Sequence, residues 1–207
     1  MVEIKKRAIS PEQKAFRRQQ ILDSTAEMFA ARSYDGVNLA DLAKAVGITK
    51  PALYRYFRSK EALFLALFER EVGRLLAAFR NAPKPDHIGP AIAGLFVRFP
   101  LYCRLSAILH TVLERDLTYA EALAFKLNVK SGLQELGGIV AGWLGPDFEG
   151  NLEDLLMQAQ QALIGVWHMT HPLGAMKEVL ENEPELEGLC HDFEATLEAH
   201  LVSLFRR

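Results

Sequence analysis

The side chains best suited to recognition chemistry in this sequence gather between positions 49 and 60, where cations alternate with tyrosines. Lys50, Arg55 and Arg58 supply positive charge, and Tyr54 and Tyr56 supply phenolic hydroxyls. Cations and hydroxyls bind phosphate oxygens, and lysine and arginine also read the edges of bases. The cluster therefore predicts contact with a nucleic acid, provided that the surrounding chain holds these side chains outward.

The elements that position this cluster are predicted to be two short helices joined by a tight turn, over residues 38–57. Asn38, with Asp41 three residues later, starts the first helix with a pattern like a capping box. Gly47 follows the apolar spacing of that helix, where a left-handed residue commonly ends a helix. The first helix is therefore expected to stop sharply before the tyrosines.

The second helix is predicted to begin at Thr49, a candidate N-cap, with Pro51 in its first turn, where a missing N–H does no harm. Leu53 and Phe57 are four residues apart and are expected to face inward together. Two helices with this turn form a helix-turn-helix, whose second helix lies in the DNA major groove.

The outward side chains of the motif, with Asn38 and Lys60 at its edges, receive expected roles from their chemistry. The expected contacts are phosphates or base edges for Lys50, Arg55, Arg58 and Lys60, phosphates for Tyr54 and Tyr56, the DNA backbone for Asn38 and Thr49, and a thymine methyl for Pro51 and Ala52.

The charge of the chain is divided unevenly. Residues 1–60 hold 12 Lys/Arg and 6 Asp/Glu, a net charge of +6, and the remainder holds 12 and 20, a net charge of −8, which together give −2. A solvated helix face explains such a division equally well when it is taken alone, but joined to the motif it favours DNA. The basic triplet Lys5–Arg7 either reaches DNA or is simply solvated.

Size and composition exclude several classes of protein. A chain of 207 residues with 50% hydrophobic residues buries a substantial core in one domain or two small ones. We find no apolar run of membrane-spanning length, and the start lacks the apolar core of a signal peptide, so cytoplasmic residence is expected. Cys103 and Cys190 suit reduced thiols better than a disulfide framework.

Metal and enzyme chemistry form the main alternative. His168 and His171 are three residues apart, and His191, Cys190 and Met157 are possible further ligands, which allows a helical metal-binding sensor or enzyme. However, no carboxylate or thiol accompanies the two histidines at a standard ligand spacing, and nucleophile-elbow, zinc-protease and phosphate-loop motifs are absent from the sequence. We therefore predict no enzyme activity, no metal and no cofactor. A module that binds only proteins is a further alternative, against which the basic first sixty residues argue.

The segment ITKPALYRYFRSKEALF resembles the recognition helix and following residues of the TetR family of transcriptional regulators, and RRQQILDSTAEMFAARSYDGV resembles the first helix of that family. The resemblance is specific from Arg17 to Phe64. Ala52 stands where many members have Thr or Ser, and Ser33 replaces a frequent Gly. The resemblance implies an all-α protein, with a three-helix helix-turn-helix domain over 1–60 and a helical ligand-binding and dimerisation domain over 61–207.

The resemblance also implies a homodimer that pairs its last two helices and is released from its operator by a small molecule. We expect those helices to begin at about Leu152 and Leu186 and to run to about Leu204. An inducer pocket is expected from mixed apolar and hydrogen-bonding residues, and their few charges favour an amphipathic or hydrophobic ligand. Core packing alone also accounts for each of these residues, which are Phe96, Tyr102, Cys103, His110, Trp167 and His168.

Overall fold

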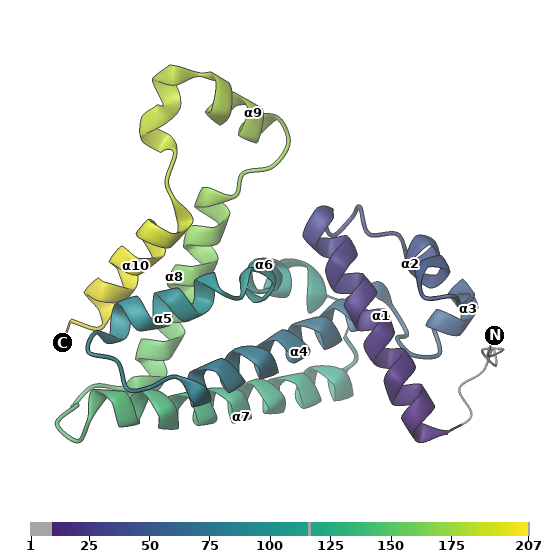
Figure 1. Cartoon of the computed structure of the whole chain (residues 1–207), viewed down its shortest axis with the longest axis horizontal. Coiled ribbons are helices and arrows are strands. Elements are labelled where there is room, and N and C mark those ends of the chain that lie inside the picture. Colours follow the sequence, from purple (N-terminus) through teal and green to yellow (C-terminus); the bar gives the residue numbers. More distant parts are fainter. Residues whose placement is uncertain (1–9, 116, 207) are drawn as a thin grey trace. The chain divides into compact units, whose positions relative to one another are not determined.

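The computed structural model describes residues 10–115 and 117–206, and every regular element in them is a helix, so the expected all-α class is confirmed. The basic triplet at 5–7 lies outside the described residues. Figure 1 follows the elements in order, which are α1 (Pro11–Ala31), α2 (Leu39–Ala45), α3 (Lys50–Leu53), α4 (Lys60–Asn81), α5 (Ile88–Val97), α6 (Pro100–Ile108), the π-helix η1 (Leu109–Leu113), α7 (Tyr119–Leu144), α8 (Leu152–Thr170), α9 (Ala175–Asn182), the 3₁₀ helix η2 (Pro184–Leu189) and α10 (Phe193–Leu204).

These helices form two compact units. Among the described residues, the first unit contains 10–70 and 111–115, and the second contains 71–110 and 117–206. Two of the crossings between the units occur inside helices, between Arg70 and Glu71 in α4 and between His110 and Thr111 in η1. Each unit therefore shares a helix with the other at two points.

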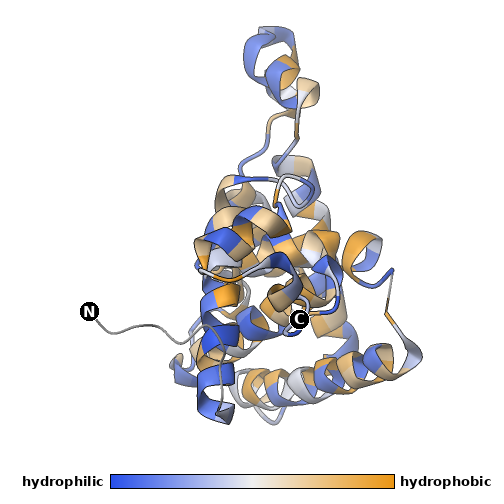
Figure 2. Cartoon of the chain, turned by 90° about the vertical axis from the view of Figure 1, so that its right-hand side faces the viewer, coloured by the Kyte–Doolittle hydropathy of each residue, from blue (hydrophilic) through white to orange (hydrophobic). Residues whose placement is uncertain are grey.

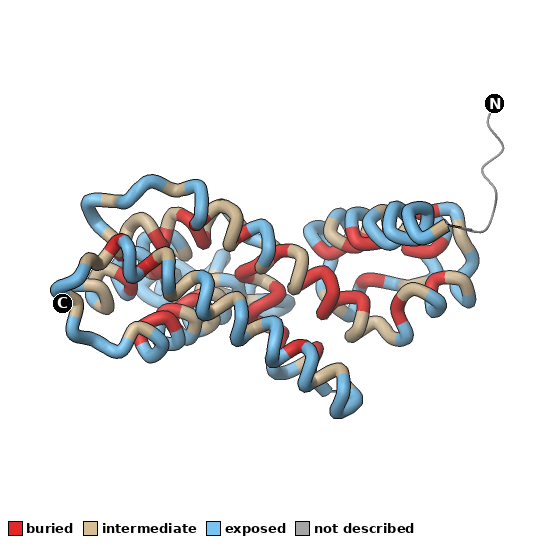
Figure 3. Tube along the Cα trace, turned by 90° about the horizontal axis from the view of Figure 1, so that it is seen from below, coloured by how far each residue is buried: buried red, intermediate tan, exposed pale blue. Residues whose placement is uncertain are grey.

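The core of the first unit is built around Phe64 of α4, which is fully buried. The ring of Phe29 meets it edge-on with ring centroids 5.0 Å apart, and Tyr34 does the same at 4.8 Å. Ile21 and Leu22 of α1 are buried in the same unit. Figure 3 shows that buried residues follow the inner sides of these helices, as an amphipathic pattern requires.

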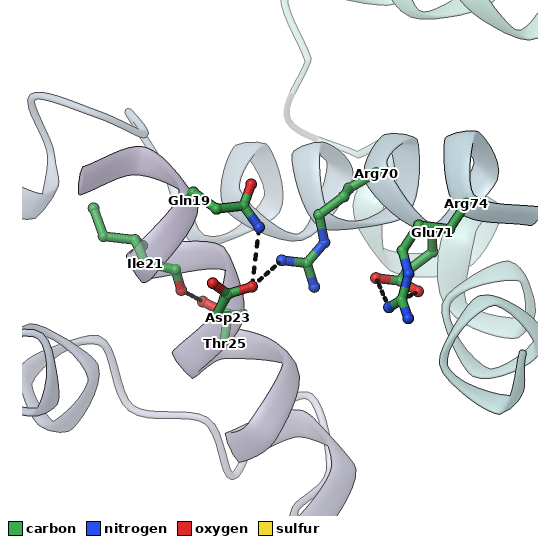
Figure 4. Close-up of polar contacts among 7 residues, drawn as sticks. All are labelled: Gln19, Ile21, Asp23, Thr25, Arg70, Glu71 and Arg74. Carbon is green, nitrogen blue, oxygen red and sulfur yellow. Dashed lines mark hydrogen bonds and ion pairs between the residues drawn. The ribbon is translucent and has the colours of Figure 1, made fainter. Parts of the chain in front are cut away.

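Polar side chains fix the beginning of α1 and its connection to α4. Ser10 and Gln13 form a reciprocal capping box at the start of α1, with Pro11 in its first turn. Further along, Asp23 accepts hydrogen bonds from Gln19 at 3.0 Å and from Arg70 at 2.7 Å (Figure 4). Because the Asp23 side chain is largely exposed, the ion pair orients α1 on α4 more than it stabilises the unit.

The second unit packs α5 and α8 against α10, and α6 and α7 against α8. Gly89 permits the close approach of α5 to α10, because a β carbon there would lie 2.7 Å from the carbonyl oxygen of Leu201. Phe79 of α4 stacks on Trp143 at 5.7 Å and meets Phe96 edge-on at 6.3 Å. Aromatic packing therefore joins α4, α5 and α7.

One buried carboxylate lies in the part of α4 that belongs to this unit. Glu71 is 1% exposed, and both of its oxygens accept hydrogen bonds from Arg74, at 3.0 and 3.3 Å (Figure 4). The charge is therefore compensated along its own helix, since a buried carboxylate is costly without a partner.

The predicted terminal helix is wrong over residues 186–192. Leu186 and Leu189 belong to η2, Cys190 ends that turn, and α10 begins only after Asp192, whose side chain accepts the N–H of Ala195 at 2.8 Å. The helix cannot extend backward because Pro184 and the Asp192 cap start separate elements. Helix α9 was not predicted at all.

Among the described residues, every helix falls short of the length and apolarity needed to cross a membrane alone. One pair, Ile88–Val97 with Pro100–Leu113, reaches both together but is bent by 86°.

Candidate nucleic-acid interface

The predicted helix-turn-helix is present, and local hydrogen bonds hold each of its parts. The amide oxygen of Asn38 accepts the N–H of Ala40 at 2.7 Å and starts α2. Gly47 takes a φ of 69°, and the next N–H, of Ile48, closes the turn on the carbonyl of Ala43 at 2.9 Å. The left-handed conformation is one that glycine adopts without steric cost, so the turn is as tight as predicted.

Helix α3 begins as predicted and ends earlier. Thr49 caps it by accepting the N–H of Ala52 at 3.3 Å, but the helix stops at Leu53 after four residues. The following residues form a tightened turn, in which the N–H of Tyr56 bonds to the carbonyl of Leu53 at 2.9 Å. Phe57 is nevertheless buried with Leu53, so the expected inward face is correct although the predicted helix is too long.

Two arginines of α1 support the motif, and sequence reasoning missed both. Arg17 donates to the carbonyl of Val46 at 2.8 Å, at the C-terminal end of α2, where unpaired carbonyls attract cations. The guanidinium of Arg18 lies over the ring of Phe57, 4.9 Å from its centroid. Their signal in the sequence was a pair of cations on the helix before the motif, without the fold that aims them.

The ten predicted contact residues are all at the surface or partly so. Tyr54 keeps 43% of its surface exposed, and Tyr56 is half-buried. The others divide into an exposed group of Asn38, Thr49, Lys50, Pro51, Arg55 and Arg58, and a half-buried pair, Ala52 and Lys60. The two tyrosines are therefore not part of the core, and the cationic surface of α3 and its turn is open.

Lys60 differs from the other cations of the cluster because it has partners within the unit. Its ammonium lies 4.3 Å from the centre of the Tyr34 ring, and the Tyr34 hydroxyl donates to Glu61 at 2.7 Å. Burial lowers the pKa of Lys60, and the carboxylates of Asp35 and Glu61 counter part of that shift. Less of its charge is therefore available to an external phosphate.

Of the predicted pocket residues, three lie together in the second unit. Phe96 and Tyr102 stack with ring centroids 5.9 Å apart, and the Cys103 thiol donates to the Phe96 carbonyl at 3.3 Å. Burial raises the pKa of Tyr102 to about 12 and that of Cys103 to about 12. The Tyr102 hydroxyl donates to Gln160 at 2.7 Å, so this group is neutral and hydrogen-bonded.

Gln160 was not predicted, although its spacing carried a signal. It lies four residues after Leu156 and three before Leu163, both of which are buried. A polar residue at that spacing on an apolar helix face needs a partner inside the unit.

The other three predicted pocket residues have different surroundings. His110 is exposed in η1, and Trp167 stacks on His171 at 3.8 Å while it meets Phe193 edge-on at 5.2 Å. The ring Nε2 of His168 lies 3.0 Å from the carbonyl oxygen of Ala107 on α6. The structure therefore does not gather all six residues around one point.

A hollow elsewhere in the second unit is too small for the expected ligand. It holds about 130 Å³ and is lined by residues of α8 and α10 with the loop before α8, among them Phe148, Asp154 and Phe205. Ligand pockets usually hold about 300–1,000 Å³. None of the six predicted pocket residues lines it.

The metal alternative gains no support from the described residues, which contain no group of three possible ligands. His171 has its Nδ1 within 3.0 Å of the Thr170 hydroxyl and 3.2 Å of the Trp167 carbonyl oxygen. Burial lowers the pKa of His171, and the Trp167 carbonyl counters part of that shift. Backbone hydrogen bonds and stacking therefore account for both His168 and His171.

Sequence comparison matches two families. Residues 21–67 match the family described as bacterial regulatory proteins of the tetR family, and residues 65–206 match the tetracyclin repressor-like C-terminal domain. The transcriptional activator FasR of Mycolicibacterium smegmatis is 38% identical over 66 residues, which are 32% of this chain and 30% of that protein. The chain spans about a third of the length of the first curated relatives it matches.

Two solved structures share the fold across most of their length. A tetR-family regulator from Streptomyces coelicolor has a TM-score of 0.55 and 21% identity, covering 93% of this chain and 89% of that one. The regulator FadR from Bacillus subtilis, solved with stearoyl-CoA, has a TM-score of 0.50 and 20% identity, covering 90% and 96%. This chain belongs to the TetR family: it is a DNA-binding transcriptional regulator, not an enzyme.

Proposed function

We propose that this protein is a homodimeric repressor that leaves its operator when a small molecule binds to the second unit. The observation that carries the proposal is the exposed cationic and tyrosine surface of α3 and its turn, on a motif whose caps are all satisfied. In functional terms we assign residues 1–60 to DNA binding and 61–207 to ligand binding and dimerisation. Because its target is chromosomal DNA, we place its work in the cytoplasm.

The proposed contacts follow from side-chain chemistry and exposure. Lys50, Arg55 and Arg58 bind phosphates or base edges, and Tyr54 and Tyr56 donate hydroxyls to phosphates. The ends of α2 and α3 at Asn38 and Thr49 offer backbone N–H groups, and Pro51 and Ala52 lie against a thymine methyl. Lys60 contributes less than the rest because it is engaged with Tyr34.

We propose dimerisation through α8 and α10, the two helices that pack together at the end of the chain. A single short recognition helix contacts few base pairs. A two-fold dimer reads two half-sites about 34–36 Å apart, or a multiple of that spacing, and so reaches useful specificity.

For the inducer we propose an amphipathic or hydrophobic molecule beside Phe96, Tyr102 and Cys103, with His110, Trp167 and His168 as further candidates. Tyr102 and Gln160 offer neutral polar groups there, which suits a ligand of low charge. The stearoyl-CoA in the Bacillus FadR structure is a largely apolar ligand of a protein with this fold. Binding would act through the two shared helices, α4 and η1, and such coupling is typically about 1–3 kcal/mol, or five- to 150-fold in affinity.

The test replaces Tyr54 by Phe, which removes one hydroxyl and keeps the ring. Operator fragments are selected from genomic DNA with the purified protein, and affinity is measured by fluorescence anisotropy across a salt series. Because each dimer carries two copies of Tyr54, we expect affinity to fall about tenfold or more, and wild-type affinity to fall steeply with salt.

The matched control is Tyr119→Phe, which removes the same hydroxyl from an exposed tyrosine of α7. It is expected to leave affinity unchanged, and both variants should keep the oligomeric state of the wild type. Equal affinities for all three proteins would remove Tyr54 from the interface, and a flat salt series would contradict phosphate binding altogether.

A further inference from the structure

The segment between α8 and α10, residues 171–192, forms an arm that contains α9 and η2. Figure 1 shows it projecting from the adjacent ends of α8 and α10, within the second unit. No residue of α9 or η2 is buried. The arm therefore contributes nothing to the core of its own unit.

The arm nevertheless has a defined internal structure. Helix α9 packs on η2, and Leu180 and Leu186 are half-buried. The Cys190 thiol donates to the carbonyl of Leu180 at 3.5 Å, and Asn182 donates to the carbonyl of Glu178 at 2.7 Å. A short folded hairpin of this kind gains little stability alone, because helices of eight residues are marginal in water.

The arm exposes apolar side chains that a solvated hairpin would not need. Leu173 is 74% exposed, Met176 62% and Val179 44%, and Leu189 adds a further 61%. Met176 and Val179 are three residues apart on one side of α9, and Met169 extends the exposed apolar surface onto the last turn of α8. Figure 2 shows apolar and polar residues side by side along the arm. Such a gathering marks an interaction surface.

Charge limits what can cover this surface. Residues 171–192 contain one lysine and six acidic residues, which gives a net charge of −5 with neutral histidines. DNA phosphates and anionic lipid headgroups are therefore repelled. Lys177, Glu178 and Glu181 lie on the side of α9 away from Met176 and Val179, where they remain in water over a covered apolar side. The occupant that fits is a protein surface.

We propose that the arm of each protomer packs its apolar side, formed by Leu173, Met176 and Val179, on a second copy of this chain. The inference rests on the proposed dimerisation through α8 and α10. Both ends of the arm continue directly into those two helices, at Thr170 and Phe193, so the arm leaves the molecule at the edge of the helix pair that meets its mate. It therefore extends over the partner and enlarges the interface beyond the four paired helices.

The test uses the full chain with Met176→Gln and Val179→Gln together. The matched control is Leu123→Gln with Leu127→Gln, an exposed apolar pair on α7 at 47% and 57% exposure. The dissociation constant of the dimer is measured by analytical ultracentrifugation, and the helix content and unfolding midpoint by circular dichroism. The arm variant should raise the dissociation constant about tenfold or more, equal to about 1.4 kcal/mol, and the control less than about twofold.

A second measurement needs no substitution. Cys190 is exposed and Cys103 is buried with its pKa raised to about 12, so a thiol reagent attaches a fluorophore to Cys190 selectively. On dilution through the dimer dissociation range, the emission of the label should shift toward that of a solvated dye.

The outcomes separate the two proposals. A monomer at all concentrations overturns both the proposed dimer and the arm contact. A dimer with an unchanged dissociation constant and a label insensitive to dilution overturns the arm contact alone. A larger loss from the α7 pair than from the arm pair also overturns it, and places the contact on α7.

Discussion

The two units of this chain are both helical, but different interactions hold their helices. In the first unit α2 has seven residues and α3 has four, lengths that do not form helices alone. Side-chain caps at Ser10, Asn38, Thr49 and Ser59 start its helices. In the second unit long helices such as α7, with 26 residues, pack through contacts between residues distant in sequence.

The difference teaches where each unit is sensitive. Short capped helices depend on a few hydrogen bonds and on one aromatic centre, Phe64. Long packed helices depend on close approach, as at Gly89, where the backbone of α10 occupies the space of a side chain. A recognition surface fixed by local caps keeps its shape while the packing of the second unit changes with a ligand.

The largest expected effect tests the aromatic centre. Phe64→Ala removes a fully buried ring in contact with Phe29 and Tyr34, and should destabilise the first unit by about 3–5 kcal/mol. Hydrogen exchange monitored by mass spectrometry separates the units, and protection should fall in residues 10–70 far more than in 117–206. The same substitution at the exposed Phe16 serves as control and should cost little. An equal loss of protection in both units would mean that they unfold together.

The next effect tests close approach in the second unit. Gly89→Ala places a β carbon 2.7 Å from backbone atoms of Leu201 and Val202, which a rotamer change cannot relieve, and should cost about 2–3 kcal/mol in urea unfolding. Gly94→Ala lies in the same helix with nothing within 4 Å of the new carbon, and should stabilise by about 0.5–1 kcal/mol. Similar effects from both variants would show that α5 and α10 are not held at this distance.

The smallest effect compares the same cap in the two units. Thr49→Ala removes the cap of α3, and Thr118→Ala removes the capping box with Glu121 at the start of α7. Each should cost about 1 kcal/mol, but only in α3, which is a single turn, should amide exchange at Ala52 and Leu53 rise throughout the helix. Serine at either position keeps the hydroxyl and should restore most of the stability. Uniform fraying of α7 after Thr118→Ala would contradict the comparison.

The helix-turn-helix was largely predictable because its determinants are local. Asn38, Gly47 and Thr49 each act within a few residues of themselves, so their spacing alone predicted two caps and a turn that the structure contains. The length of α3 was not predictable in this way. Its end at Leu53 follows from the tightened turn that brings Phe57 into the core, which depends on α1 and on Arg18 above that ring.

The second unit was less predictable because its contacts join distant positions. Apolar spacing on residues 186–204 suggested one continuous helix, whereas Pro184 and the Asp192 cap divide the segment and create the arm. The six predicted pocket residues fitted a composition rule, but their partners were invisible in the sequence. The Gln160 partner of Tyr102 is 58 residues away, and the Ala107 partner of His168 is 61 residues away.

The sequence by itself determined the all-helical class, the helix-turn-helix and the outward placement of its cations and tyrosines, because periodicity, caps and glycine conformation act over a few residues. Only the tertiary structure decided that Lys60 binds Tyr34, that Arg17 closes α2, and that residues 171–192 leave the core as an arm. Each of these depends on which surfaces meet after the chain has folded, and neighbouring residues do not specify that.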